Sequence, residues 1–137
     1  MENLIERFVK YAKIYTTSDE DSTSTPSTEI QKNLAKILVE DLKEIGVENS
    51  YMDDNGYVYG FVPSNTDKMC NTIGFISHMD TAPAACGENV NPQIHKNYNG
   101  KDLILNKEKN IVLSINEFPY LKDQVGKTLI TSDGTTL

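Results

Sequence analysis

The sequence predicts an α/β fold with helices packed on a mixed sheet. Two amphipathic helical patterns open the chain, a hairpin signal follows them, and an apolar run of strand length comes next. No repeat interrupts this order. With 137 residues, the chain is one domain or part of one, and it can bury only a modest hydrophobic core.

The first helix is expected over residues 2–15, because apolar side chains recur there every three or four residues. These side chains are Leu4, Ile5, Phe8, Val9, Ala12 and Tyr15. The next segment, residues 16–28, is rich in serine, threonine and acidic residues. This composition is typical of an exposed loop.

The second helix is expected to begin at Pro26 and to end at Gly46. Thr25 can cap its amino end, Pro26 suits the first helical position, and Glu29 lies in the first turn. One apolar stripe follows, formed by Ile30, Leu34, Ile37, Leu38, Leu42 and Ile45. Gly46 can adopt the positive φ angle that often ends a helix.

The middle of the chain predicts a hairpin and then a buried strand. Residues 47–52 and 57–62 have the pattern of two strands joined at Asn55-Gly56. Asn-Gly favours a type I′ turn, because both residues tolerate positive φ angles. Residues 72–77 form a nearly continuous apolar run, which is typical of a strand covered on both faces.

The remainder of the chain predicts irregular structure followed by short strands. Residues 82–101 contain two prolines and two glycines and are expected to be irregular. Short strands are expected at residues 103–105, 111–115 and 128–131.

The composition argues against several partners. Lys and Arg total 13 while Asp and Glu total 20, and the resulting net charge of −7 disfavours nucleic acid or an anionic membrane as the main partner. No segment approaches the ~20 apolar residues of a membrane span. Cys70 and Cys86 form neither a CxxC pair nor a disulfide framework. They are expected to be buried or half-buried thiols in a reduced, cytoplasmic protein.

His78 and Asp80 directly follow the predicted strand at residues 72–77. Because side chains alternate along a strand, the two are expected on one face, at the carboxyl end where α/β sheets bind ligands. A metal-binding histidine commonly has a carboxylate that fixes its orientation. The pair is interpreted as a metal ligand, His78, and its orienting residue, Asp80. A structural or incidental pair is the alternative, because His-x-Asp is a frequent tripeptide.

Other candidate motifs do not fit their chemistry. The Gly-Lys-Thr at 126–128 lacks the first glycine of a phosphate-binding loop, since that position is Leu121. The acidic run at 53–56 lacks the first ligand of a calcium loop, since that position is Tyr51. His95 lies among turn residues and is expected to be a surface histidine rather than a second ligand.

Three parts of the sequence, in order along the whole chain, carry a family resemblance. The first comprises residues 4–8, 18–22 and 25–29, the second is Ile76-Ser77-His78-Met79-Asp80-Thr81, and the third is residues 129–137. Together they resemble the peptidase T (tripeptide aminopeptidase) family, which belongs to the two-zinc aminopeptidase/carboxypeptidase/aminoacylase clan.

The resemblance implies a fold and a site. Residues 1–137 are expected to be the amino-terminal part of a mixed-sheet zinc-exopeptidase catalytic domain with flanking helices. His78 is expected to be a metal ligand, Asp80 the catalytic residue that orients it, and zinc the cofactor, with two ions per active site. The family's metal-bridging aspartate, glutamate pair and inserted domain have no counterpart in these residues, so the chain is expected to be a fragment with exposed apolar faces.

The implied function is removal of the amino-terminal residue from short peptides, tripeptides in particular, by a cytoplasmic enzyme that can form a homo-oligomer. The fragment alone is expected to be inactive. Two alternatives stay open. One is a related hydrolase of dipeptides or N-acyl amino acids. The other is a non-catalytic acidic α/β interaction domain, in which His78 and Asp80 form a buried hydrogen bond and bind no metal.

Overall fold

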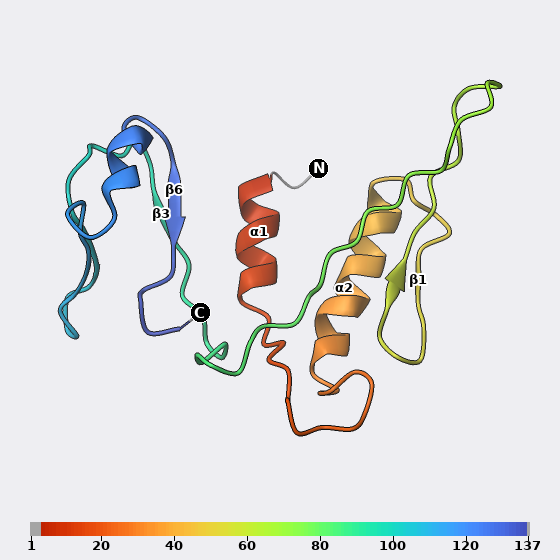
Figure 1. Ribbon diagram of the computed structural model, residues 1–137, viewed down its shortest axis with the longest axis horizontal. Coiled ribbons are helices and arrows are strands. Elements are labelled where there is room, and N and C mark those ends of the chain that lie inside the picture. Colours follow the sequence, from red (N-terminus) through yellow and green to blue (C-terminus); the bar gives the residue numbers. More distant parts are fainter. Residues whose placement is uncertain (1–3, 137) are drawn as a thin grey trace. The chain divides into compact units, whose positions relative to one another are not determined.

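The computed structural model describes residues 4–136, and the chain divides into two compact units (Figure 1). Unit 1 combines residues 4–14 with residues 84–136, and unit 2 comprises Tyr15–Pro83. The elements in chain order are α1 (Leu4–Ala12), α2 (Gln31–Glu44), β1 (Tyr51–Met52), β2 (Val58–Tyr59), β3 (Gln93–His95), β4 (Leu103–Asn106), β5 (Ile111–Leu113), the 3₁₀ helix η1 (Pro119–Gln124) and β6 (Leu129–Thr131).

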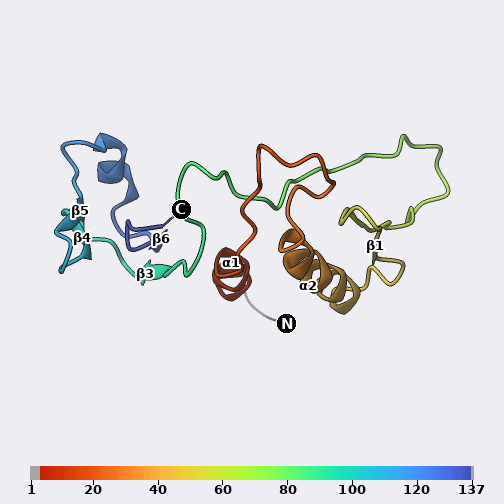
Figure 2. The same ribbon diagram turned by 90° about the horizontal axis from the view of Figure 1, so that it is seen from below.

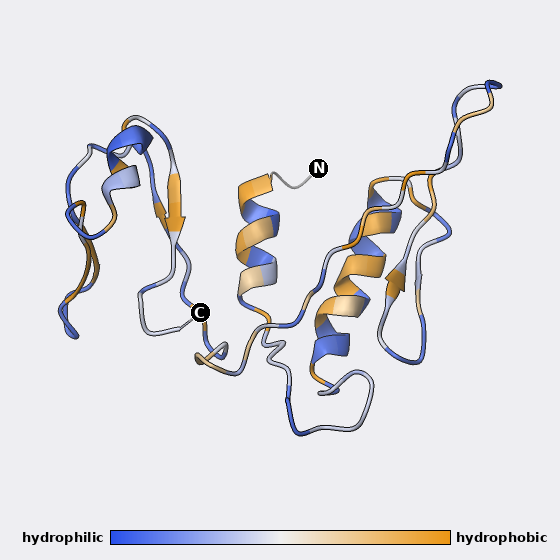
Figure 3. Ribbon diagram, viewed as in Figure 1, coloured by the Kyte–Doolittle hydropathy of each residue, from blue (hydrophilic) through white to orange (hydrophobic). Residues whose placement is uncertain are grey.

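In unit 2, α2 lies beside the hairpin of β1 and β2 (Figures 1 and 2). Leu34 and Ala35 on α2 are buried, as is Val47 just beyond it. Figure 3 shows that apolar residues recur along α2, as the predicted stripe requires. The small number of residues in the unit limits this core to a few side chains.

The helix α2 begins at Gln31, later than the predicted start at Pro26. Two side chains in the intervening segment bond to the preceding loop. Ser27 Oγ accepts a hydrogen bond from the backbone N–H of Asp19 (3.0 Å), and Thr28 Oγ1 donates to the carbonyl of Thr17 (2.7 Å). Serine and threonine side chains that bond in this way compete with helix formation, so the predicted cap at Thr25 is wrong.

The carboxyl end of α2 is where the sequence predicts it. Gly46 has a φ angle of 97°, and its N–H donates to the carbonyl of Lys43 (3.0 Å). The N–H of Val47 donates to the carbonyl of Leu42 (2.9 Å). These two bonds form a Schellman motif, which satisfies carbonyls that the helix leaves unpaired.

The hairpin is confirmed, but its strands are shorter and its turn is of another type. Tyr51 pairs with Tyr59 and Met52 with Val58. The N–H of Gly56 donates to the carbonyl of Asp53 (3.0 Å), and Gly56 alone in this turn has a positive φ angle, 84°. A type I′ turn needs two such residues, so this is a type I turn followed by a left-handed glycine.

Residues 72–77 do not form the predicted buried strand. The side chains of Ile73, Phe75 and Ile76 are 76%, 96% and 102% exposed. Within residues 4–136, the strands form three separate two-stranded antiparallel sheets, and none of them includes this segment. The combination of helices and strands is therefore confirmed, whereas the mixed sheet is not formed. The apolar pattern is that of a strand, but no neighbouring strand pairs with it.

In unit 1, α1 ends at Ala12, three residues before the predicted end. The strands β4, β5 and β6 confirm the three that the sequence predicts beyond residue 101. The strand β3 pairs antiparallel with β6 and is not predicted, because it lies within the segment expected to be irregular. Tyr98 and Leu121 are each 3% exposed and form the buried centre of this unit.

Both cysteines are free and exposed. The absence of a disulfide agrees with their spacing, but the expectation that Cys70 and Cys86 are buried is wrong. Cys70 lies in an exposed segment that comes just before Ile73. Among the helices that the structure describes, none is long and apolar enough to cross a membrane.

Candidate functional site

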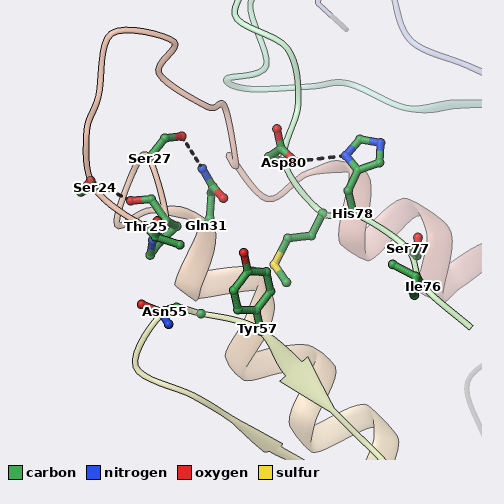
Figure 4. A pocket seen from close by; sticks show the side chains of 13 residues that line it. Ser24, Thr25, Ser27, Gln31, Asn55, Tyr57, Ile76, Ser77, His78 and Asp80 are labelled. Carbon is green, nitrogen blue, oxygen red and sulfur yellow. Dashed lines mark hydrogen bonds and ion pairs between the residues drawn. The ribbon is translucent and has the colours of Figure 1, made fainter. Parts of the chain in front are cut away.

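His78 and Asp80 contact each other in unit 2. The Nδ1 atom of His78 lies 3.1 Å from Oδ1 of Asp80, and the two side chains are 83% and 38% exposed (Figure 4). The prediction that the two side chains are within reach of each other is confirmed. The central strand from which they are expected to project is absent, and they lie instead in an extended segment.

The contact has a chemical consequence for the imidazole ring. A carboxylate beside Nδ1 favours the neutral tautomer that carries its proton on Nδ1. The lone pair of Nε2 is then available to a metal ion or a proton donor. Because the His78 side chain is mostly exposed, an incoming ligand can reach it without rearrangement of the unit.

A cavity of about 400 Å³ adjoins the pair. Its walls are residues 24–27 with Gln31, the hairpin turn at 55–57, and residues 76–80. Figure 4 shows Tyr57 and Gln31 on the side of the cavity opposite His78 and Asp80. Sequence patterns carry no signal for Tyr57 or Gln31 as site residues, because the segments that hold them meet only in the folded unit.

The segment after Asp80 is anchored to the loop that precedes α2. Thr81 forms a parallel bridge with Thr17, and the N–H of Ser18 donates to the carbonyl of Thr81 (3.0 Å). The sequence predicts only an exposed loop for residues 16–28, yet Thr16 is 2% exposed. This loop is the second feature of the site that sequence reasoning misses.

His78 could supply one ligand of a metal site, but the described side chains around it do not complete such a site. Between residues 4 and 136, no three histidine, cysteine, aspartate or glutamate side chains gather into a cluster that could hold a metal ion. Zinc in proteins is normally held by three or four protein ligands. A single imidazole with an orienting carboxylate supplies one of them.

The sequence predicts that His95 is a surface histidine among turn residues, but the structure places it in a strand. It lies in β3 of unit 1 and is half-buried. Its Nε2 atom is 3.0 Å from Oγ1 of Thr131 on the paired strand β6. The structure thus gives His95 a partner within its own sheet.

The tail that contributes to the family resemblance forms a local turn around Asp133. Oδ1 of Asp133 accepts hydrogen bonds from Oγ1 of Thr135 (2.6 Å) and from the backbone N–H of Thr135 (2.9 Å). These two bonds hold the pKa of Asp133 below its usual range, and the bond from the Thr135 hydroxyl contributes more than the bond from the backbone N–H. The charged form of Asp133 is therefore favoured in the folded chain.

Thr135→Val is expected to raise the pKa of Asp133 towards its ordinary value, because it removes the hydroxyl donor and keeps the backbone donor. A depressed folded-state pKa adds stability that is lost as the pH falls through that pKa, so the variant should lose less stability in acid than the parent chain. Carboxyl titration by NMR measures the shift. Thr136→Val is the matched control, since Oγ1 of Thr136 has no hydrogen-bond partner among the described residues. An unchanged pKa in Thr135→Val would contradict this account.

Comparison with known proteins identifies similar sequences over the whole chain. It is 58% identical to the peptidase T of Clostridium acetobutylicum and 56% identical to that of Caldanaerobacter subterraneus subsp. tengcongensis, in each case over 137 residues. It is 55% identical over 136 residues to the peptidase T of Bacillus pumilus. The resemblance to the peptidase T family is confirmed. The chain spans about a third of the length of these curated relatives, and no family model matches it.

Proposed function

We propose that this chain contributes to a metal-dependent peptidase that removes the amino-terminal residue from short peptides, tripeptides in particular. The observation that carries the proposal is the contact between His78 Nδ1 and Asp80 Oδ1, which leaves Nε2 exposed at the edge of a cavity. The identity of 54–58% to proteins named peptidase T supports the class of reaction. The cytoplasmic location and a homo-oligomeric state belong to the same proposal.

In this proposal, His78 binds zinc through Nε2 and Asp80 holds the ring in the required tautomer. Zinc, when bound, supplies Lewis acidity towards a peptide carbonyl. Asp80 also increases the basicity of His78 as a ligand, because its carboxylate accepts a hydrogen bond from the Nδ1–H group. A site with two zinc ions requires further donors in addition to His78, and the cluster that would supply them is not found among residues 4–136.

The cavity beside the pair is of a suitable size for part of a small substrate. Its volume of about 400 Å³ lies within the range of ~300–1,000 Å³ that is typical of small-ligand sites. Its walls include hydroxyl and amide side chains, which can bond to the backbone of a short peptide. Hydrolysis of dipeptides or of N-acyl amino acids would need a cavity of the same kind. Substrate assays distinguish these two activities from the proposed hydrolysis of tripeptides.

The non-catalytic alternative requires a buried hydrogen bond between His78 and Asp80. The two side chains are 83% and 38% exposed, so this requirement is not met. An exposed pair contributes little to stability, since water competes for both partners. In the peptidase proposal, the same exposure allows a ligand to reach the imidazole of His78.

The proposal is tested by comparing the isolated chain with a chimera. In the chimera, residues 1–137 replace the 137 residues that they match in the Clostridium acetobutylicum protein. The isolated chain is expected to show no saturable zinc binding by calorimetry and no peptide hydrolysis, because one imidazole cannot form a zinc shell. The chimera is expected to hydrolyse tripeptides and to lose activity when a chelator removes zinc.

Two results would contradict the proposal. One is tight, stoichiometric zinc binding by the isolated chain, which would require several ligands in addition to His78. The other is a folded chimera that hydrolyses tripeptides at the same rate before and after chelation. The unmodified Clostridium acetobutylicum protein, assayed in parallel, is the control for the chimera.

A further inference from the structure

We propose that Thr17 and Ser18 are positioning residues that hold the His78–Asp80 pair in place by binding Thr81. The inference rests on the proposed function, because it concerns the side chains that would present Nε2 of His78 to a metal. It also goes beyond that function, since neither Thr17 nor Ser18 contacts His78 or Asp80 through any described hydrogen bond.

The backbone of Thr81 is bonded on both sides to the loop before α2. Its N–H donates to the carbonyl of Thr16 (3.3 Å). Its carbonyl accepts from the N–H of Ser18 (3.0 Å) and from Oγ of Ser18 (3.1 Å). Thr81 follows Asp80 directly, so these bonds fix the carboxyl side of the Asp80 backbone.

The side chain of Thr17 adds a further bond, since its Oγ1 lies 3.1 Å from Oγ1 of Thr81. The loop is itself attached to the beginning of α2. Thr28 Oγ1 donates to the carbonyl of Thr17 (2.7 Å), and Nε2 of Gln31 donates to Thr28 Oγ1 (3.1 Å). A continuous series of hydrogen bonds therefore runs from α2 to the residue beside Asp80.

The residues on the other side of the pair provide no comparable support. Residues 71–78 are all exposed, and none of the three sheets includes them. Thr16, by contrast, is 2% exposed. Within unit 2, the hydrogen bonds that hold the backbone next to Asp80 are therefore those to Thr81.

Positioning matters for an exposed pair. A contact between exposed partners gains little net free energy, and it must offset the entropy of holding both side chains in one geometry. A fixed backbone at Asp80 lowers that entropic cost. If the bond between the hydroxyl groups of Thr17 and Thr81 is lost, the carboxylate should spend less time at Nδ1, and the Nε2–H tautomer of His78 should gain population.

The test is the tautomer ratio of His78, measured by ¹⁵N NMR of the imidazole rings in the isolated chain at alkaline pH with chelator present. The sequence contains two histidines, so His95 is an internal reference in unit 1. Thr17→Val is expected to lower the ratio of Nδ1–H to Nε2–H at His78 by up to about fivefold, the equilibrium factor of one typical hydrogen bond. The ratio at His95 should not change.

Matched variants separate positioning from a general loss of structure. Thr17→Ser keeps the hydroxyl and should restore the wild-type ratio. Ser18→Ala keeps the backbone donor and should give a smaller change in the same direction. Thr23→Val changes an exposed threonine of the same loop and should have no effect.

Equal His78 ratios in the wild type, Thr17→Val and Ser18→Ala would overturn the inference. Changes of equal size at His78 and His95 would also overturn it. Because no metal is present, the outcome is independent of whether the chimera hydrolyses peptides.

Discussion

Asp80→Asn is expected to lower the rate of peptide hydrolysis by the chimera about 10- to 100-fold, the usual effect of losing a carboxylate that orients a metal-binding histidine. An asparagine amide carries no charge, and its NH₂ group can face Nδ1 of His78 and favour the wrong tautomer. The side chain of Asp80 is 38% exposed, so the substitution should not disturb a core. The rate constant kcat, measured on a tripeptide at saturating zinc, checks the prediction.

Asp67→Asn is the matched control for this experiment. It makes the same chemical change in an exposed loop of unit 2, away from the cavity. Its rate should equal that of the unmodified chimera, and circular dichroism should give the same unfolding temperature for both variants. If Asp80→Asn hydrolysed the tripeptide as fast as the unmodified chimera, Asp80 would not have the orienting role, although His78 could still be a ligand.

The parts of the site that the sequence predicts are those that depend on residues close together in the chain. His78 and Asp80 are two residues apart, so an extended backbone is enough to bring them together, with or without a sheet. The end of α2 is likewise predictable, because Gly46 and its neighbours form the terminating hydrogen bonds among themselves.

The parts that the sequence does not predict depend on partners that are distant in the chain. Thr28 bonds to Thr17 instead of continuing α2, and Thr81 bonds to a loop more than sixty residues before it. The pattern at residues 72–77 shows that apolar side chains follow one another with little polar interruption, but it does not specify which segment covers them. The pattern therefore predicts burial for side chains that the structure exposes.

Because the apolar side chains of residues 72–77 are exposed, the isolated chain is expected to self-associate. Phe75 and Ile76 are 96% and 102% exposed, and residues 71–78 carry backbone N–H and C=O groups that no sheet engages. Contiguous exposed apolar side chains and unpaired strand-like backbone both favour association between copies. The chain is expected to form oligomers at micromolar concentrations in analytical ultracentrifugation.

Phe75→Asp is expected to raise the dissociation constant of these oligomers at least about tenfold, because burying one large apolar side chain is worth about 1.5–3 kcal/mol. Thr72→Asp is the control, since it adds the same negative charge to the same segment without removing a large apolar side chain. It should have a much smaller effect, which reports charge repulsion alone. A wild-type chain that sediments as a monomer would refute the association, and equal shifts in the two variants would show that charge, not apolar contact, governs it.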